Sequence, residues 1–203
     1  MAVDPGSMDP HHHHPASGHR WLDIILAVSA VFISLMSLFM AIQHGRVMER
    51  MVEASTWPYV MAYHSTHDDD GTPHVHLALT NKGVGPARIE SLEVFYEGRP
   101  MRNSHALAGA ILKPAGSPDH LFVLSSDVLH GVIAAKETQD YVIFPPQHYT
   151  PEQYAALVSA MGRMQYRVCY CSVFEECAVF DSHATPLVSA VKACPTGGVQ
   201  FGD

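Results

Sequence analysis

Histidines and aspartates gather around one short connector in the middle of the chain. His64 and His67 precede Asp68-Asp69-Asp70, and His74 and His76 follow it. Residues two apart on a strand share a face, so His74 and His76 could chelate one metal ion. His64 or His67 could join them from the paired strand, and imidazole with carboxylate suits zinc, copper or nickel better than magnesium. The competing interpretation, which the sequence favours, is a solvated hairpin tip whose histidines face water.

Four cysteines lie near the end of the chain, Cys169, Cys171, Cys177 and Cys194. An even number is typical of disulfides in an oxidising compartment. The spacing C-x-C-x5-C-x16-C lacks the two C-x2-4-C pairs of most zinc sites. Cys171 and Cys177 bracket a turn, which leaves Cys169 for Cys194, but three pairings exist and the sequence does not choose between them. In a cytoplasmic domain, a metal site of cysteine and histidine would be favoured over disulfides.

No known catalytic motif occurs in the chain. It has no G-x-S-x-G elbow, no H-E-x-x-H, no P-loop and no Rossmann glycine fingerprint. Ser125, Ser126, Asp127 and His130 contain the residue types of a hydrolytic triad, but these types recur by chance in a histidine-rich chain. We therefore expect neither an enzyme nor a cofactor. The net charge of −8 also argues against a nucleic-acid-binding protein.

One long apolar segment near the start of the chain has the length of a membrane-spanning helix. Ile24 to Ile42 contains 19 residues without a charge. As a helix it would be about 29 Å long, close to the ~30 Å of a bilayer's hydrocarbon core. The apolar region of a signal peptide is shorter, ~7 to 15 residues, and is followed by a cleavage site that this segment lacks. The sequence thus favours an uncleaved membrane helix over 21–43, continued by a juxtamembrane helix over 44–56, rather than a cleaved signal peptide.

The direction of insertion depends on two opposing signals. Arg20 precedes the segment and Arg46 and Arg50 follow it, so the count of positive charges slightly favours a cytoplasmic C-terminal side. The four cysteines favour export of the domain that carries them. Because a difference of one charge is weak evidence, we expect the N-terminus to be cytoplasmic and the C-terminal domain to be exported.

Small residues form a stripe along the apolar segment. Their spacings of three, four, three and four residues place them on one helix face: Ala27, Ala30, Ser34, Ser37 and Ala41. Small side chains let two membrane helices approach closely, so this stripe could mediate a homodimer. The alternative is a chance pattern, because Ala and Ser are common in membrane helices.

The remainder predicts a mainly β fold, an antiparallel β-sandwich over 57–194 with one or two short helices. Pro58 ends the preceding helix. A short helix is expected after the N-cap Thr150, and a helical turn over Ser104 to Ile111. Residues 1–20 are expected to be disordered and 195–203 to form a flexible tail. The expected strands are Tyr59–Ser65, His74–Thr80, Arg88–Tyr96, Leu121–Ser125, Val128–Ile133, Tyr141–Phe144, Tyr166–Val173 and Ala178–Asp181.

Three short motifs resemble those of a known group of proteins. They are Trp57-Pro58-Tyr59, Asn81-x-Gly83-x-Gly85-Pro86-Ala87, and Cys169-Tyr170-Cys171-Ser172-Val173-Phe174. Over Trp21 to Asp181 the chain is similar to small single-pass bacterial envelope proteins of uncharacterised function with an immunoglobulin-like extracytoplasmic domain. The resemblance implies an anchor in the bacterial inner membrane and an immunoglobulin-like domain in the periplasm. It implies no functional residue, because the motifs are structural.

These observations lead to two functional hypotheses. The first is a membrane-anchored β-sandwich module for protein interaction or self-assembly in the bacterial envelope, with a protein partner that the sequence does not identify. The alternative is an envelope protein that binds or senses a metal through the histidines or cysteines.

Overall fold

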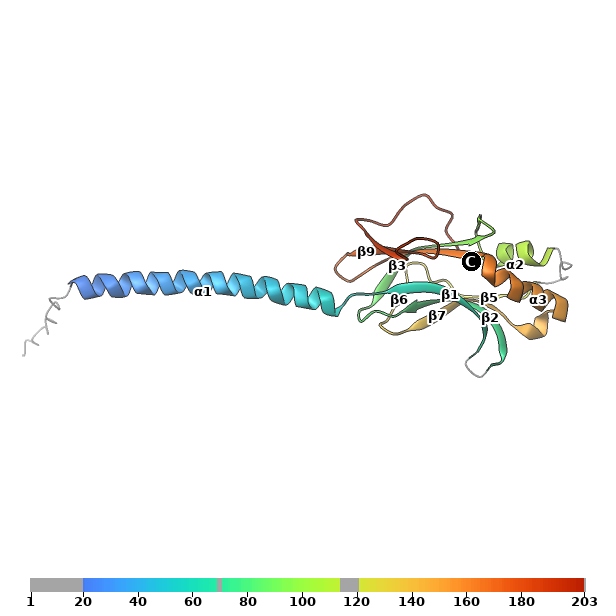
Figure 1. Cartoon of the computed structure of the whole chain (residues 1–203), viewed down its shortest axis with the longest axis horizontal. Helices are drawn as coiled ribbons and strands as arrows, with labels where there is room; N and C mark the ends of the chain where they lie inside the picture. Colours follow the sequence, from blue (N-terminus) through green and yellow to red (C-terminus); the bar gives the residue numbers. More distant parts are fainter. Residues whose placement is uncertain (1–19, 69–70, 114–120, 203) are drawn as a thin grey trace, which may run out of the picture. The chain divides into compact units, whose positions relative to one another are not determined.

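The computed structural model describes residues 20–68, 71–113 and 121–202 (Figure 1). The chain divides into two compact units, residues 1–49 and 50–203. The expected disordered segment over 1–20 lies outside the described residues, except for Arg20.

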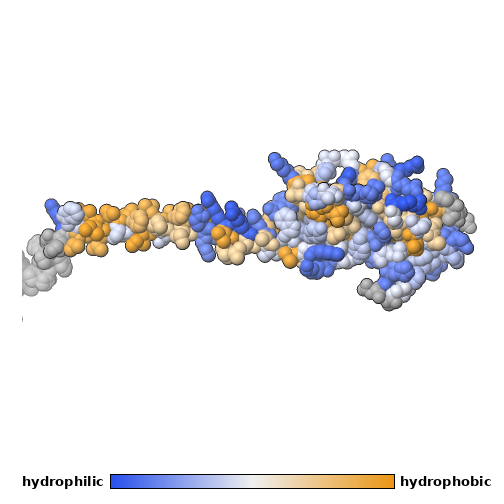
Figure 2. All heavy atoms as spheres, in the orientation of Figure 1, coloured by the Kyte–Doolittle hydropathy of each residue, from blue (hydrophilic) through white to orange (hydrophobic). Residues whose placement is uncertain are grey.

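Helix α1 (Arg20–Ser55) is one continuous helix through both segments that the sequence analysis separated at residue 43. None of its residues is buried, and apolar side chains cover most of its first half (Figure 2). Its length and composition suit a membrane span and, at this place in the chain, equally a signal sequence. Two of its serines donate to backbone carbonyls one turn earlier, Ser29 to Leu26 at 2.9 Å and Ser34 to Ala30 at 2.8 Å, which satisfies their hydroxyls within the helix.

The first sheet contains the hairpin around the acidic connector. Its strands are β1 (Val60–His67), β2 (Pro73–Asn81), β7 (Thr138–Phe144) and β5 (Leu124–Ser125), in the order β1-β2-β7-β5. Every neighbouring pair is antiparallel. Along β2, Val75, Leu77 and Leu79 are fully buried, so the alternate residues, including His74 and His76, lie on the other face.

The second sheet contains the cysteines. Its main order is β10 (Val188–Val191), β9 (Cys177–Asp181), β8 (Met164–Cys171), β3 (Ala87–Tyr96) and β4 (Arg99–Met101), and β6 (Val132–Ile133) pairs with β3. All pairs are antiparallel. The hairpin of β8 and β9 brings Cys171 directly opposite Cys177.

Two short helices join the sheets, as the sequence predicted. Helix α2 (Ser104–Leu112) begins after Asn103, whose side chain accepts a bond from the Ala106 amide. Helix α3 (Pro151–Ala160) begins after Thr150, which forms a reciprocal capping box with Gln153. Single 3-10 turns lie on either side of α3, before it at Pro146–His148 (η2) and after it at Met161–Arg163 (η3). The fold is therefore mixed helix and β rather than mainly β, with antiparallel sheets after a long apolar helix.

One hydrophobic cluster contains side chains from both sheets and both short helices. Exclusion of this apolar surface from water is the main force that holds the second unit together. Its largest fully buried members are Tyr141, Tyr170, Phe144, Leu77, Leu79, Ile89, Leu92, Leu107, Leu112, Ile133, Leu157 and Met161.

Asn81, at the end of β2, joins the start of the domain to the loop over 83–85 and to β6. Its side chain is fully buried and makes four hydrogen bonds. The amide nitrogen donates to the carbonyls of Gly85 at 2.7 Å and Ile133 at 3.2 Å. The carbonyl oxygen accepts from the backbone amides of Tyr59 at 3.1 Å and Gly83 at 3.0 Å. All donor and acceptor capacity of this buried amide is thus used within the protein.

The chain just after α1 packs against the loop that follows Asn81. The amides of Val84 and Gly85 donate to the Trp57 carbonyl at 3.0 and 3.4 Å. A Cβ atom added to Gly85 would lie 1.8 Å from the Thr56 carbonyl oxygen. The backbone at Gly85 therefore lies so close to the backbone at Thr56 that only glycine, which has no Cβ, fits at position 85.

The structure also differs from the expected strands. Strands β4 and β10 were not predicted, because each is short and lies at a sheet edge. The strand expected over Val128–Ile133 shrinks to β6, since His130 has a φ of 58° and a turn bond joins the Gly131 amide to Val128.

The end of the chain is packed rather than free. Phe201 is 4% exposed and its amide donates to the Leu92 carbonyl at 2.8 Å, while the Gly202 amide donates to Arg102 at 3.0 Å. The segment expected to be a flexible tail over 195–203 therefore has fixed contacts through residue 202.

Candidate functional site

Three potential metal ligands converge at the β1–β2 hairpin: Asp68, His74 and His76. Each offers one ligand atom, and these atoms all lie within 4.8 Å of one another. His74 and His76 occupy the outward face of β2, with ring centroids 5.1 Å apart. Asp68 comes from the end of the hairpin, where its Oδ2 lies 2.9 Å from His74 Nδ1. The spacing of two along a strand thus brings both imidazoles to one carboxylate.

A carboxylate lies near each imidazole, within hydrogen-bond distance at His74 and farther away at His76. Asp68 contacts Nδ1 of His74, and Asp140 on β7 lies with its Oδ1 3.8 Å from Nε2 of His76. Metal-ligating histidines commonly donate the ring nitrogen that does not bind the metal to a carboxylate. Asp140 was not among the predicted site residues, because pairing of β2 with β7 joins positions that are far apart in sequence.

The other nitrogen of each ring, His74 Nε2 and His76 Nδ1, is buried and has no hydrogen-bond partner among the described residues. A buried polar atom without a partner costs stability, so such atoms mark places where a ligand can bind. An ion between Asp68 and the two rings would need one nitrogen of each imidazole to turn its lone pair toward the carboxylate.

A surface hollow of about 590 Å³ adjoins the hairpin. The edge of the Tyr63 ring packs against His76, with centroids 6.2 Å apart. The hollow is lined by Tyr63, Ser65, His67, Asp68, His76, Thr138 and Asp140. Its wall is therefore polar and carries two carboxylates, which favours a cationic ligand.

The structure separates the four histidines that the sequence grouped. His64 pairs with the buried Leu77, on the opposite side of the sheet from His74 and His76, and its Nδ1 lies 3.1 Å from the Tyr166 hydroxyl. Burial lowers the pKa of His64, which favours its neutral form. His67 lines the hollow, but its Nδ1 contacts Thr66 Oγ1 at 2.9 Å. Alternation along β1 explains why His64 faces inward.

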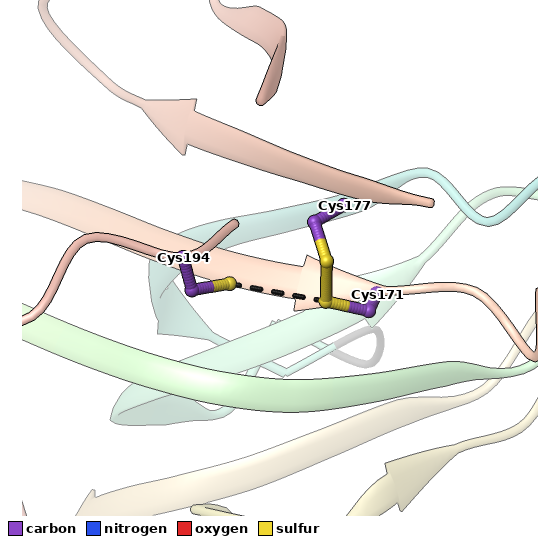
Figure 3. Close-up of side chains that lie close together, drawn as sticks. All are labelled: Cys171, Cys177 and Cys194. Carbon is purple, nitrogen blue, oxygen red and sulfur yellow. Dashed lines mark hydrogen bonds between the residues drawn. A yellow bond between two sulfur atoms is a disulfide. The ribbon is translucent and has the colours of Figure 1, made fainter. Parts of the chain in front are cut away.

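All four cysteines form disulfides, Cys169 with Cys194 and Cys171 with Cys177. This is one of the three pairings that the sequence allowed. The two bonds are neighbours, because Cys169 and Cys171 lie two residues apart on β8. Figure 3 shows Cys171 Sγ facing Cys194 Sγ, at 3.9 Å. While both disulfides are intact, no thiolate of these four is available to a metal.

The small-residue stripe lies on α1, at Ala27, Ala30, Ser34, Ser37 and Ala41. All five side chains are exposed. The Ser34 hydroxyl is bonded to the Ala30 carbonyl, so the stripe presents little unsatisfied polarity to a second helix.

A comparison with protein families finds one match. A family model with the description "Domain of unknown function (DUF8453)" matches residues 19–162. No curated protein and no solved structure matches the chain. The matched span includes α1 and the Asp68–His74–His76 group, whereas the cysteines lie beyond its end.

Proposed function

The chain belongs to the family described as Domain of unknown function (DUF8453), and from its geometry we propose that it is a membrane-anchored domain that binds a divalent transition metal ion. The ligands are Asp68, His74 and His76. One observation carries this proposal: one potential ligand atom from each of these three side chains lies within 4.8 Å of the other two.

The donor set decides which metals fit. Two imidazoles and one carboxylate suit zinc, copper or nickel, and three protein ligands leave a coordination position open. The side chains of His74 and Asp68 are 28% and 41% exposed, so the ion would exchange with solvent. These features favour reversible binding of an ion from solution over a closed structural site.

Calorimetric titration with zinc tests the proposal. The sample is the full-length chain in detergent micelles, with His11 to His14 replaced by serine throughout because four consecutive imidazoles could bind the added zinc themselves. We expect one zinc ion per chain with a Kd of about 1 μM, or about −8 kcal/mol. His74→Ala and His76→Ala should each weaken binding at least about tenfold, because each removes one ligand.

The matched control is His148→Ala. The His148 ring stacks on Phe122, with centroids 3.9 Å apart, and it does not line the hollow. Its replacement should leave zinc binding unchanged. Binding weaker than about 1 mM, or an equal loss in all three variants, would refute the metal site.

We also propose that residues 57–194 form an immunoglobulin-like β-sandwich that is exported to the periplasm of a bacterial envelope and has no catalytic activity. Two antiparallel sheets with a shared core support the sandwich. The two disulfides support an oxidising compartment.

A second candidate function is self-assembly, or binding of another membrane protein, through α1. The supporting observation is that α1 runs without a break from Arg20 to Ser55, which keeps the stripe on one face over its whole length. Ala30→Cys and Ser37→Cys should therefore form disulfide-linked dimers in carbonate-washed membranes after mild oxidation, which non-reducing gels detect.

Phe32→Cys and Phe39→Cys are the controls, because they lie about 200° further around the helix. They should give much less dimer. Equal yields at all four positions would indicate random collision and contradict a defined helix interface.

A further inference from the structure

The two disulfides lie beneath a groove that no part of the proposed metal function uses. Cys171, Cys177 and Cys194 line it, together with Arg88 and Lys192, and its volume is about 620 Å³. The segment 192–198 forms one of its walls. The groove is wide enough for a small molecule or the side chain of a partner, so reagents can reach sulfur atoms here.

The sulfur atoms differ in accessibility. Cys169 and Cys171 are 1% and 3% exposed, whereas Cys177 and Cys194 are partly exposed. A thiol in the groove therefore reaches Cys177 Sγ more readily than Cys171 Sγ. Attack on Cys177 would release Cys171 as the leaving thiolate.

The released sulfur would have a second disulfide beside it. Cys171 Sγ lies 3.9 Å from Cys194 Sγ, close to van der Waals contact, and Cys194 is bonded to Cys169 (Figure 3). Thiol–disulfide exchange proceeds by attack of a thiolate on a sulfur of a neighbouring disulfide. Arg88, which lines the same groove, is paired with Glu90 and Glu175, so Lys192 is the cation of the lining left to favour a thiolate.

We propose that the two disulfides form a coupled thiol–disulfide exchange site, which reacts stoichiometrically with a thiol that enters the groove. The incoming thiolate bonds to Cys177 Sγ, and the electron pair of the broken Cys171–Cys177 bond goes to Cys171. The Cys171 thiolate then bonds to Cys194 Sγ, and the electron pair of the Cys169–Cys194 bond goes to Cys169, which takes a proton from water. With a dithiol reductant, its second thiol displaces Cys177, so the reductant is oxidised and the protein gains thiols at Cys169 and Cys177.

This exchange moves the attachment of the C-terminal segment. Cys194 would be linked to Cys171 instead of Cys169, two residues further along β8. The segment 192–198, which forms a wall of the groove, would move with it. The inference is independent of the metal site, since the hairpin at Asp68 does not contribute to this groove.

Peptide mapping tests the exchange directly. The full-length chain in detergent is treated with one equivalent of dithiothreitol, quenched with acid and alkylated with N-ethylmaleimide. Chymotryptic cleavage after Tyr170 separates Cys169 from Cys171, so mass spectrometry distinguishes the isomers. We expect the singly reduced protein to contain a Cys171–Cys194 bond, with alkylated Cys169 and Cys177. A singly reduced protein that retains Cys169–Cys194 would overturn the proposal.

A Cys177→Ser variant provides a second test without added reductant. Its free Cys171 should exchange with Cys194, so alkylation of Cys169 should be at least about tenfold faster than in the control, because the attack is intramolecular. The control is Cys171→Ser with Cys177→Ser, which has no free thiol. Alkylation of Cys171 alone in Cys177→Ser would contradict the coupling.

Discussion

Replacement of Gly85 by alanine is expected to destabilise the domain by at least about 3 kcal/mol, or to prevent its folding. The added Cβ would lie 1.8 Å from the Thr56 carbonyl oxygen and 2.4 Å from its carbon. Both are backbone atoms, so no side-chain rotation relieves the overlap. The loop could accept the methyl group only by moving away from Thr56 and Trp57, which would break the bonds from Val84 and Gly85 to the Trp57 carbonyl.

Denaturation of the full-length chain in detergent by guanidinium, followed by tryptophan fluorescence, measures this loss. Gly109→Ala is the matched control, because nothing lies within 4 Å of its added Cβ and it lies inside α2. Alanine there should stabilise the protein by about 0.5–1 kcal/mol, since glycine is a poor helix former. If Gly85→Ala kept the wild-type midpoint, the close approach to Thr56 would be wrong.

Asn81→Ala should have the second large effect, a loss of about 4 kcal/mol in the free energy of unfolding. The substitution removes four hydrogen bonds from a fully buried position. It removes the side-chain partner of the amides of Tyr59 and Gly83 and of the carbonyls of Gly85 and Ile133, and each buried group left unpaired costs about 1–3 kcal/mol. Water entering the space left by the amide would recover part of this cost.

The comparison for Asn81 is Asn103→Ala. Asn103 also accepts a backbone hydrogen bond, from Ala106 at 2.9 Å, but it caps α2 at an exposed position. Loss of an N-cap costs about 1 kcal/mol. Asn81→Asp adds a second test. The aspartate keeps an acceptor for the amides of Tyr59 and Gly83, but it places an oxygen where Asn81 donates to the carbonyls of Gly85 and Ile133. Equal losses in the free energy of unfolding for Asn103→Ala and Asn81→Ala would show that the four buried hydrogen bonds of Asn81 contribute no more to stability than one exposed helix cap.

Local patterns in the sequence were sufficient for several elements. Thr150 followed by Pro151 predicted the start of α3, because capping depends on residues within one turn. The turn between β8 and β9 predicted that Cys171 and Cys177 could pair, since both lie at the ends of one hairpin. The acidic connector likewise predicted the hairpin of β1 and β2.

Features that depend on distant pairing were not predictable. Asp140 reaches His76 only because β7 lies beside β2. The choice of Cys169 for Cys194 depends on the path of 192–198 over β8, which no local pattern specifies. Phe201 lies three residues after the Gly197-Gly198 pair, where no local pattern predicts burial, and its ring packs against Tyr141 with ring centroids 5.8 Å apart.

The junction at Asn81 and Gly85 also determines how mechanical load enters the domain. Tension applied at Ser55 would act first on the bonds between residues 57–59 and the loop over 81–85. These include the Lys82 amide to the Tyr59 carbonyl at 2.8 Å, the Val84 amide to the Trp57 carbonyl at 3.0 Å, and the Tyr59 amide to Asn81 at 3.1 Å. Bonds loaded side by side share the force and resist rupture together. The start of the domain is therefore tied to both sheets within a few residues of the end of α1, because Asn81 on β2 also donates to the Ile133 carbonyl on β6.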